Sequence, residues 1–156
     1  MYLKMKKIIL FFAGMLLLTT LSCDNEDPIV YPEVTGVWKP VQMVKTVVNN
    51  VNAPTSETFL YGDCQQESRW EFREDGTGKI LWRVQLNPTS CTTAFEQNLQ
   101  YDYNNSNGDI VINYITHQER GKAMDITETS MNLKIETINA DTQVYESQVY
   151  TLVKVQ

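Results

Sequence analysis

In "SRWEFREDGTGKILWRVQL", residues 68–86, bulky and polar side chains alternate on both sides of a short glycine-containing turn. Trp70 and Phe72 lie on one face before the turn, and Trp82 continues the same period after it. A period of two is typical of half-buried strands. Asp75-Gly76, at the turn, tolerates the positive φ that tight hairpin turns require. The sequence therefore predicts an antiparallel hairpin with its large rings on one face.

The same period recurs along the chain and predicts further strands. We expect eight, at residues 36–48, 67–73, 77–86, 95–103, 109–116, 121–127, 131–138 and 142–155. Nearly every connection after residue 66 is of hairpin length, so strands adjacent in sequence should pair. Eight such strands leave two exposed edges unless the sheet closes. We therefore predict an all-β, eight-stranded antiparallel up-and-down barrel; the alternative, a β-sandwich, would need long crossing connections.

One connection, residues 49–66, is long and shows no clear period. Loops of this length are usually functional or disordered. In a barrel it would arch over one mouth as a lid. Cys64, near its far end, could then attach it to the turn at residues 87–91.

The first 22 residues are basic, then apolar, then small, which is the order of a secretory signal peptide. Leu21 and Ser22 before Cys23 resemble the lipobox of bacterial lipoproteins, in which the cysteine is lipidated and becomes the new N-terminus. Residues 23–34 are acidic and contain two prolines, so we expect a solvated tether behind the anchor. This leader implies an outer-membrane lipoprotein of the cell envelope. The acidic tract also resembles the surface-export signal of some Gram-negative lipoproteins, and mere solubility is the alternative reading.

The charge of the chain argues against a nucleic-acid partner. Removing the leader removes three lysines and no acid, so the formal net charge changes from −6 to −9 for residues 23–156. Such a surface repels phosphate backbones, and no basic stripe interrupts it.

With Cys23 lipidated, Cys64 and Cys91 remain in an oxidising compartment, and one disulfide between them is the simplest expectation. In the chain-entropy model a loop of this length contributes roughly 3 to 4 kcal/mol. A catalytic thiol would need a histidine nearby, and the sequence has only His117.

The run "TGVWKPV", residues 35–41, resembles a known family. Gly36-Val37-Trp38 is similar to the G-x-W signature of lipocalins. Together with "RWEFREDGTG" and the final "YTLVKV", residues 35–156 look like the lipocalin-like domain found in many bacterial lipoproteins. The resemblance implies that Trp38 plugs the closed end of the barrel beneath a basic residue of the last strand, the position that Lys154 takes.

Two further features could suggest a metal or catalytic site, but each has a simpler interpretation. Residues 102–109, "DYNNSNGD", space three oxygen-bearing side chains like calcium ligands, but Gly108 falls one place late and Asn113 stands where a glutamate is required. A hairpin turn is the better prediction. His117 lies in an expected turn with no further metal ligands or catalytic partners around it.

The inward positions of the expected strands offer no pair of carboxylates for a glycosidase. We therefore expect neither an enzyme nor a metal site or cofactor.

The inward-facing aromatic residues are the most informative cluster. An eight-stranded barrel is just wide enough to be filled by side chains or to hold one small ligand. We expect a small apolar or amphipathic ligand, with the possible binding residues Trp70, Phe72, Trp82, Leu99, Tyr101 and Tyr114. The alternative is a packed barrel that acts as a non-catalytic interaction or scaffolding module and contacts a protein or glycan through its loops.

Overall fold

The computed structural model describes residues 30–49 and 51–155 of the chain. The expected signal peptide (residues 1–22), the expected lipidation site Cys23 and the first part of the tether lie outside the described residues. Among the described residues, no helix is long and apolar enough to cross a membrane.

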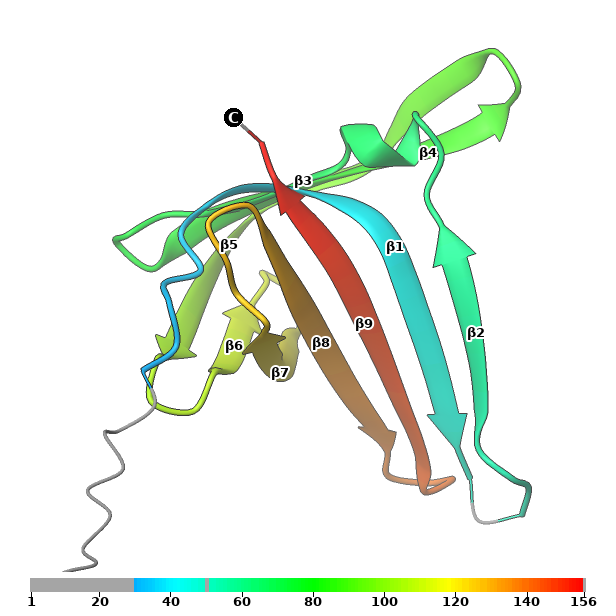
Figure 1. The fold of residues 1–156 in the computed structure, drawn as a ribbon. Coiled ribbons are helices and arrows are strands. Elements are labelled where there is room, and N and C mark those ends of the chain that lie inside the picture. Colours follow the sequence, from blue (N-terminus) through cyan, green and yellow to red (C-terminus); the bar gives the residue numbers. More distant parts are fainter. Residues whose placement is uncertain (1–29, 50, 156) are drawn as a thin grey trace, which may run out of the picture.

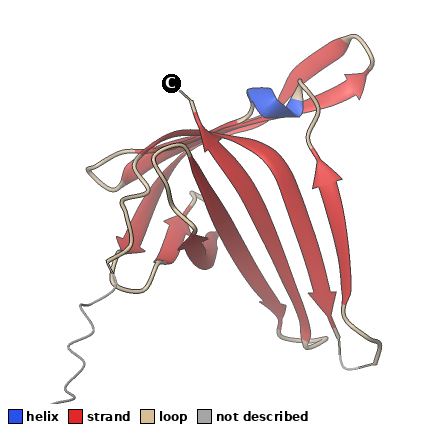
Figure 2. Cartoon of the chain, in the orientation of Figure 1, coloured by secondary structure: helices blue, strands red, loops and turns tan. Residues whose placement is uncertain are grey.

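The described chain is built almost entirely of strands (Figure 2). The elements are β1 (Gly36–Val48), β2 (Thr55–Leu60), the 3-10 helix η1 (Gln65–Glu67), β3 (Arg69–Phe72), β4 (Thr77–Asn87), β5 (Ser90–Asn104), β6 (Asp109–Asn113), β7 (Gln118–Met124), β8 (Ser130–Asn139) and β9 (Val144–Lys154).

These strands form one antiparallel sheet in the order β2-β1-β3-β4-β5-β6-β7-β8-β9, and β1 also pairs with β9. This pairing runs from Trp38 opposite Lys154 to Val48 opposite Tyr145 and joins the two ends of the meander. Figure 1 shows β8, β9 and β1 side by side at this junction. Strand β1 and strands β3 to β9 thus form a closed eight-stranded barrel. The predicted barrel is confirmed and the β-sandwich alternative is wrong.

Strand β2 is an additional strand that the sequence pattern did not reveal. It pairs with the second half of β1, from Gln42 opposite Leu60 to Val47 opposite Thr55. All six of its residues are exposed, and Figure 1 shows it standing beside β1. The prediction of a lid is therefore wrong for Thr55–Leu60, which extend the sheet beside β1. Pairing with β1 satisfies the backbone hydrogen bonds of this segment, which a free loop would leave to water.

The hydrophobic core fills the end of the barrel where β1 begins and β9 ends. Its most deeply buried large side chains are Trp38, Phe72, Ile110, Ile112, Met131, Leu133 and Leu152. The indole Nε1 of Trp38 donates a hydrogen bond to the carbonyl oxygen of Val34 at 2.8 Å. Lys154 Nζ lies 5.2 Å from the centre of the Trp38 ring. The structure therefore places both residues of the expected barrel-closing pair at this closed end.

The last part of the expected tether packs on the barrel. The backbone N–H of Tyr31 donates to the carbonyl of Asn105 at 2.7 Å, and the Tyr103 hydroxyl donates to the carbonyl of Pro32 at 3.0 Å. Val34 is fully buried. The expectation of a solvated segment up to residue 34 is thus wrong for Tyr31 and Val34, whereas Pro32 and Glu33 are exposed. This segment is short and contains a proline and an acidic residue, so it shows no hydrophobic period from which its packing could be predicted.

The wall of the barrel is less complete at the opposite end. Strand β5 pairs with β6 only from Gln100 to Asn104, although β5 begins at Ser90. Strand β3 likewise pairs with β4 only from Arg69 to Phe72. The end of the β4–β5 hairpin where β4 ends and β5 begins therefore extends beyond the neighbouring strands, as Figure 1 shows. The interior of the barrel is open toward this end.

Candidate ligand-binding site

A cavity of about 510 Å³ lies inside the barrel, between the core and the open end. This volume falls within the range of about 300 to 1,000 Å³ that is usual for small-molecule sites. Six aromatic side chains form much of its wall: Tyr61, Trp70, Trp82, Phe95, Tyr114 and Tyr150. The remaining lining residues are Met43, Ile80, Gln97, His117, Glu119, Ile135 and Gln148. Because seven of the eight barrel strands contribute a residue, this cavity is the barrel interior itself.

The aromatic side chains pack around Trp82. Its ring centre lies 5.3 Å from that of Trp70 and 5.7 Å from that of Tyr61, both edge to face. Tyr150 meets it edge to face at 6.3 Å, and Phe95 is stacked at 6.4 Å. Edge-to-face and offset-stacked pairs are the arrangements that aromatic quadrupoles favour. The cavity therefore has a wall of mutually packed aromatic rings from β3, β4, β5, β9 and the segment after β2.

Three of the six expected ligand-binding residues line the cavity: Trp70, Trp82 and Tyr114. The other three do not. Phe72 and Leu99 are 2% and 3% exposed within the core, and the Tyr101 ring packs edge to face on Phe72 at 5.0 Å. The Tyr101 hydroxyl donates to the carbonyl of Arg73 at 2.6 Å, outside the cavity. These three residues fill the closed half of the barrel.

A group of polar side chains at the cavity was missed by the sequence analysis. The ring of His117 stacks on Tyr114 with ring centres 4.6 Å apart. The Tyr114 hydroxyl donates to Glu119 Oε2 at 3.1 Å, and His117 Nε2 lies 3.6 Å from Glu119 Oε1. The sequence analysis left His117 as a turn residue without a role and did not identify Glu119 as an inward-facing side chain; the structure places both at the cavity. A usable signal was present, because Glu119 is in phase with Gly121 and the buried Ala123.

A second set of hydrogen bonds runs along the inner face of β9. The Tyr150 hydroxyl donates to the Gln148 side-chain oxygen, and Gln148 Nε2 donates to Glu146 Oε1 at 2.9 Å. Lys45 Nζ forms an ion pair with the same Glu146 oxygen at 2.9 Å. The hydrogen bonds from Lys45 and then Gln148 lower the pKa of Glu146. These polar side chains, which lie toward the open end of the barrel, thus satisfy one another's hydrogen-bonding groups and charges.

Burial controls the ionisation of the cavity tyrosines. It raises the pKa of Tyr61 to about 12. Burial also raises the pKa of Tyr114, and the Glu119 carboxylate adds to this rise. The pKa of Tyr150 is raised by burial as well. Desolvation disfavours a phenolate, so these hydroxyls stay neutral near pH 7.

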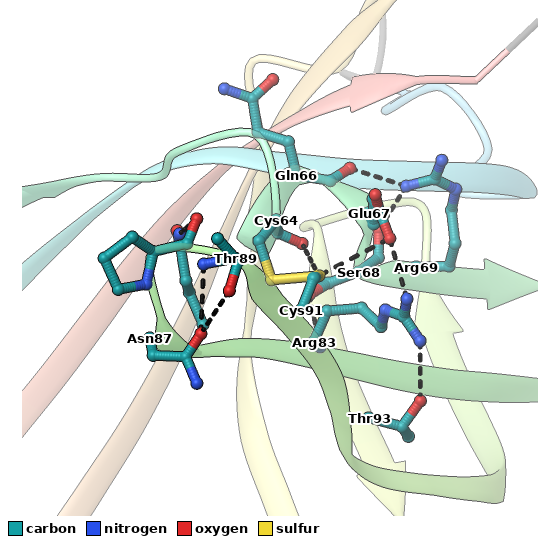
Figure 3. Close-up of a disulfide and its surroundings, with 12 residues drawn as sticks. Cys64, Gln66, Glu67, Ser68, Arg69, Arg83, Asn87, Thr89, Cys91 and Thr93 are labelled. Carbon is teal, nitrogen blue, oxygen red and sulfur yellow. Dashed lines mark hydrogen bonds and ion pairs between the residues drawn. A yellow bond between two sulfur atoms is a disulfide. The ribbon is translucent and has the colours of Figure 1, made fainter.

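The expected disulfide is confirmed between Cys64 and Cys91, whose Cα atoms are 5.5 Å apart (Figure 3). It joins the residue before η1 to the second residue of β5. Close by, Arg83 Nη2 forms an ion pair with Glu67 at 3.0 Å, and the backbone N–H of Arg83 donates to Ser68 Oγ at 2.9 Å. These contacts hold η1, and with it the segment that carries Tyr61, against the β4–β5 hairpin.

The described residues contain no group of three or more His, Cys, Asp or Glu side chains placed to hold a metal ion. Glu119 is the single carboxylate in the cavity wall, and both cysteines of the described chain are joined to each other. The chemistry that this site offers is an aromatic wall with hydrogen-bonding groups on one side.

Comparison with known proteins identifies the family of this chain. No curated protein matches the sequence. Among solved structures, a deswapped triple mutant of bovine odorant binding protein is similar, with 14% sequence identity and a TM-score of 0.42 over 78% of this chain and 73% of that one. The family model described as "Lipocalin-like domain" matches residues 34–152. This match spans nearly the whole barrel, from Val34, which accepts the Trp38 hydrogen bond, to Leu152 near the end of β9, and the chain therefore belongs to the lipocalin-like domain family.

Proposed function

We propose that this protein is a lipid-anchored lipocalin-like protein of the cell envelope that binds a small apolar or amphipathic molecule in its barrel. The cavity of about 510 Å³ with its six aromatic residues is the observation on which this proposal rests. Members of the lipocalin family are typically binding proteins without catalytic activity, which supports binding as the role of the cavity. A barrel filled by its own side chains, the premise of a purely scaffolding role, fits this volume poorly.

The path of the chain gives the proposed anchor an orientation. Residues Tyr31 to Val34 run along the closed end of the barrel, where Tyr31 is hydrogen-bonded to the β5–β6 turn. A lipid on Cys23 would hold the protein by this end. The cavity opens toward the other end, so its mouth would point away from the membrane.

Ligand binding can be tested on protein purified from its own membrane. Native mass spectrometry should show a retained small molecule. Trp70 and Trp82 line the cavity and Trp38 is buried in the core, so a bound ligand should change the fluorescence of two of the three tryptophans. Trp82→Phe should reduce this response, whereas Leu86→Ala, at an exposed position of the same strand, should not. A bare mass together with no fluorescence response to apolar or amphipathic probes would contradict the proposal.

The anchor is tested separately from the ligand. Cys23→Ala should move the protein from the membrane fraction to the soluble fraction, because the diacylglycerol acceptor is lost. Retention of the Cys23→Ala protein in the membrane would refute the lipid anchor and leave the cavity argument intact.

A further inference from the structure

The cavity wall carries an acidic charge and no permanent positive one. Among the described lining residues, Glu119 is the one acidic side chain, and neither lysine nor arginine occurs. Its side chain is one-third exposed, so the carboxylate borders both the cavity and the solvent at the mouth. His117, which stacks on Tyr114, lies with its Nε2 3.6 Å from Oε1 of Glu119. A carboxylate ligand would therefore meet repulsion here, whereas a cation would find a partner.

Two of the three tyrosine hydroxyls in the cavity, those of Tyr114 and Tyr150, are arranged to accept hydrogen bonds from a ligand. Tyr114 donates its proton to Glu119, and Tyr150 donates its proton to Gln148. A phenol has one proton to donate but also lone pairs that can accept. With both protons committed to protein acceptors, the two oxygens offer lone pairs, so this side of the cavity favours a ligand that donates.

The nearest lysine on the inner face of the barrel is already neutralised. Lys45 pairs with Glu146 at 2.9 Å, and Gln148 donates to the same carboxylate. The side chains of Lys45 and Glu146 are each about one-third exposed, above the cavity. Lys45 is thus held by a partner of its own and is not free to bind an anionic head group.

The aromatic wall is also suited to a cation. Trp82 is surrounded by Trp70, Tyr61, Tyr150 and Phe95, with ring centres 5.3 to 6.4 Å from its own. A positively charged nitrogen is attracted to the faces of aromatic rings, most strongly to tryptophan, and aromatic side chains are used to recognise quaternary ammonium groups. The formal net charge of −6 of the whole chain attracts cations at longer range as well.

We propose that the barrel binds an amphipathic cation, an amine or quaternary ammonium compound whose charged nitrogen lies between Glu119 and the aromatic wall while its apolar part packs against Trp70 and Trp82. This inference rests on the proposed ligand-binding function and names the chemical class of the ligand. A cation in this position balances the charge of Glu119, and a protonated amine, unlike a quaternary ammonium group, can also donate hydrogen bonds to the two tyrosine oxygens. A fatty acid of the same length leaves Glu119 facing a second carboxylate.

Three probes with the same alkyl chain test the inference: octyltrimethylammonium, octanol and octanoate. Their affinities for the full-length protein are measured by isothermal titration calorimetry below their aggregation concentrations, with detergent alone as the blank. We expect the cation to bind at least about tenfold more tightly than octanoate, because the cation is attracted to Glu119 and the aromatic faces whereas octanoate is repelled by Glu119. Octanol should lie between the two.

Two variants and one control assign the effect to the site. Glu119→Gln, which keeps the size of the side chain, should remove most of the preference for the cation and leave the octanol affinity within about twofold, since the aromatic packing is unchanged. Trp82→Leu should weaken octyltrimethylammonium more than octanol. Glu96→Gln removes the same charge from the outer face of β5, where Glu96 pairs with Lys79, and should leave the preference unchanged.

The possible outcomes distinguish a failure of this inference from a failure of the proposed ligand-binding function. If octanoate binds as tightly as the cation, or if Glu119→Gln and Glu96→Gln have equal effects, the cationic ligand is refuted and the binding function stands. If none of the three probes binds and the native protein carries no small molecule, the proposed function fails and the inference fails with it.

Discussion

Lys154 Nζ lies 5.2 Å from the centre of the Trp38 ring, and the two residues are direct partners across the seam where β9 closes onto β1. The contact therefore joins the last strand of the barrel to the first. Gly36, two residues before Trp38, makes room for it, because a Cβ at this position would lie 2.5 Å from Cε of Lys154. Gly36 and Trp38 of the G-x-W motif thus both contribute to the contact between Lys154 and the indole ring.

The cation over the indole should contribute measurably to stability. We expect Lys154→Met, which keeps an apolar stem of similar length, to lower the free energy of unfolding by about 0.5 to 2 kcal/mol. Lys39→Met, on the outward face of the same β1 strand, serves as the control and should change it by less. Urea unfolding followed by far-UV circular dichroism measures both. Equal effects of the two substitutions would show that the indole contact contributes nothing.

Gly36 adopts a φ of +135°, a conformation that other residues rarely adopt. Gly36→Ala should therefore destabilise the fold by about 1 to 3 kcal/mol through backbone strain. The clash with Lys154 involves the flexible end of a side chain and should add little. In the double variant Gly36→Ala/Lys154→Ala the loss caused by Gly36→Ala should persist. If the second substitution restores stability, the clash, and not the backbone, is the cause.

The disulfide closes the segment that includes β3, β4 and the hairpin to β5. Replacing both cysteines, as Cys64→Ser/Cys91→Ser, should lower the free energy of unfolding by roughly 3 to 4 kcal/mol, because the unfolded chain regains the entropy of the open loop. Reduction of the wild-type protein with dithiothreitol should give a similar loss and is the matched control for the two new hydroxyl groups. A loss in both samples of less than about 1 kcal/mol would contradict the chain-entropy account.

The closed barrel could be predicted because its determinants are local. Gly76 and Gly108 have φ values of +76° and +79°, as the Asp-Gly and Asn-Gly turns required. Each turn fixes one antiparallel pair, and successive pairs lead to closure. Strand β2 could not be predicted in this way, since its exposed residues have no buried face to produce a period.

The site was harder to predict than the fold because a period of two gives the face of a residue but not its height along the barrel axis. Phe72 and Trp70 share the inward face of β3, yet Phe72 lies in the core and Trp70 also borders the cavity. Height depends on the register between strands, which distant pairings set. Leu99 and Tyr101 also face inward, but they lie at the height of the core and therefore do not line the cavity.

Glu119 was missed for a different reason. A charged residue is assumed to point outward, because burial of an unpaired charge is costly. Here Glu119 stays partly solvated and accepts a hydrogen bond from Tyr114, which lessens that cost. Inward charges of this kind break the hydrophobic pattern at the places where a ligand would be recognised.

The ion pair between Lys45 and Glu146 links β1 to β9 at the open end of the seam and should make stability depend on pH. Hydrogen bonds from Lys45 and Gln148 lower the pKa of Glu146 from its ordinary value of 4.5. A carboxyl whose pKa is lower in the folded than in the unfolded chain stabilises the fold above the unfolded pKa, and this contribution is lost as the pH falls through the folded pKa. Glu146→Gln should therefore be less stable than the wild type at neutral pH.

The difference between wild type and Glu146→Gln should shrink as the pH is lowered below 4.5, because the wild-type carboxyl then becomes protonated too. Urea unfolding at neutral pH and at several values down to about pH 3 measures this convergence, which follows from proton linkage. Glu128→Gln, in the exposed turn before β8, is the control for the change in net charge. If the deficit of Glu146→Gln is the same at every pH, its cause is lost packing or a lost neutral hydrogen bond, and the charge of Glu146 does not help to hold the seam closed.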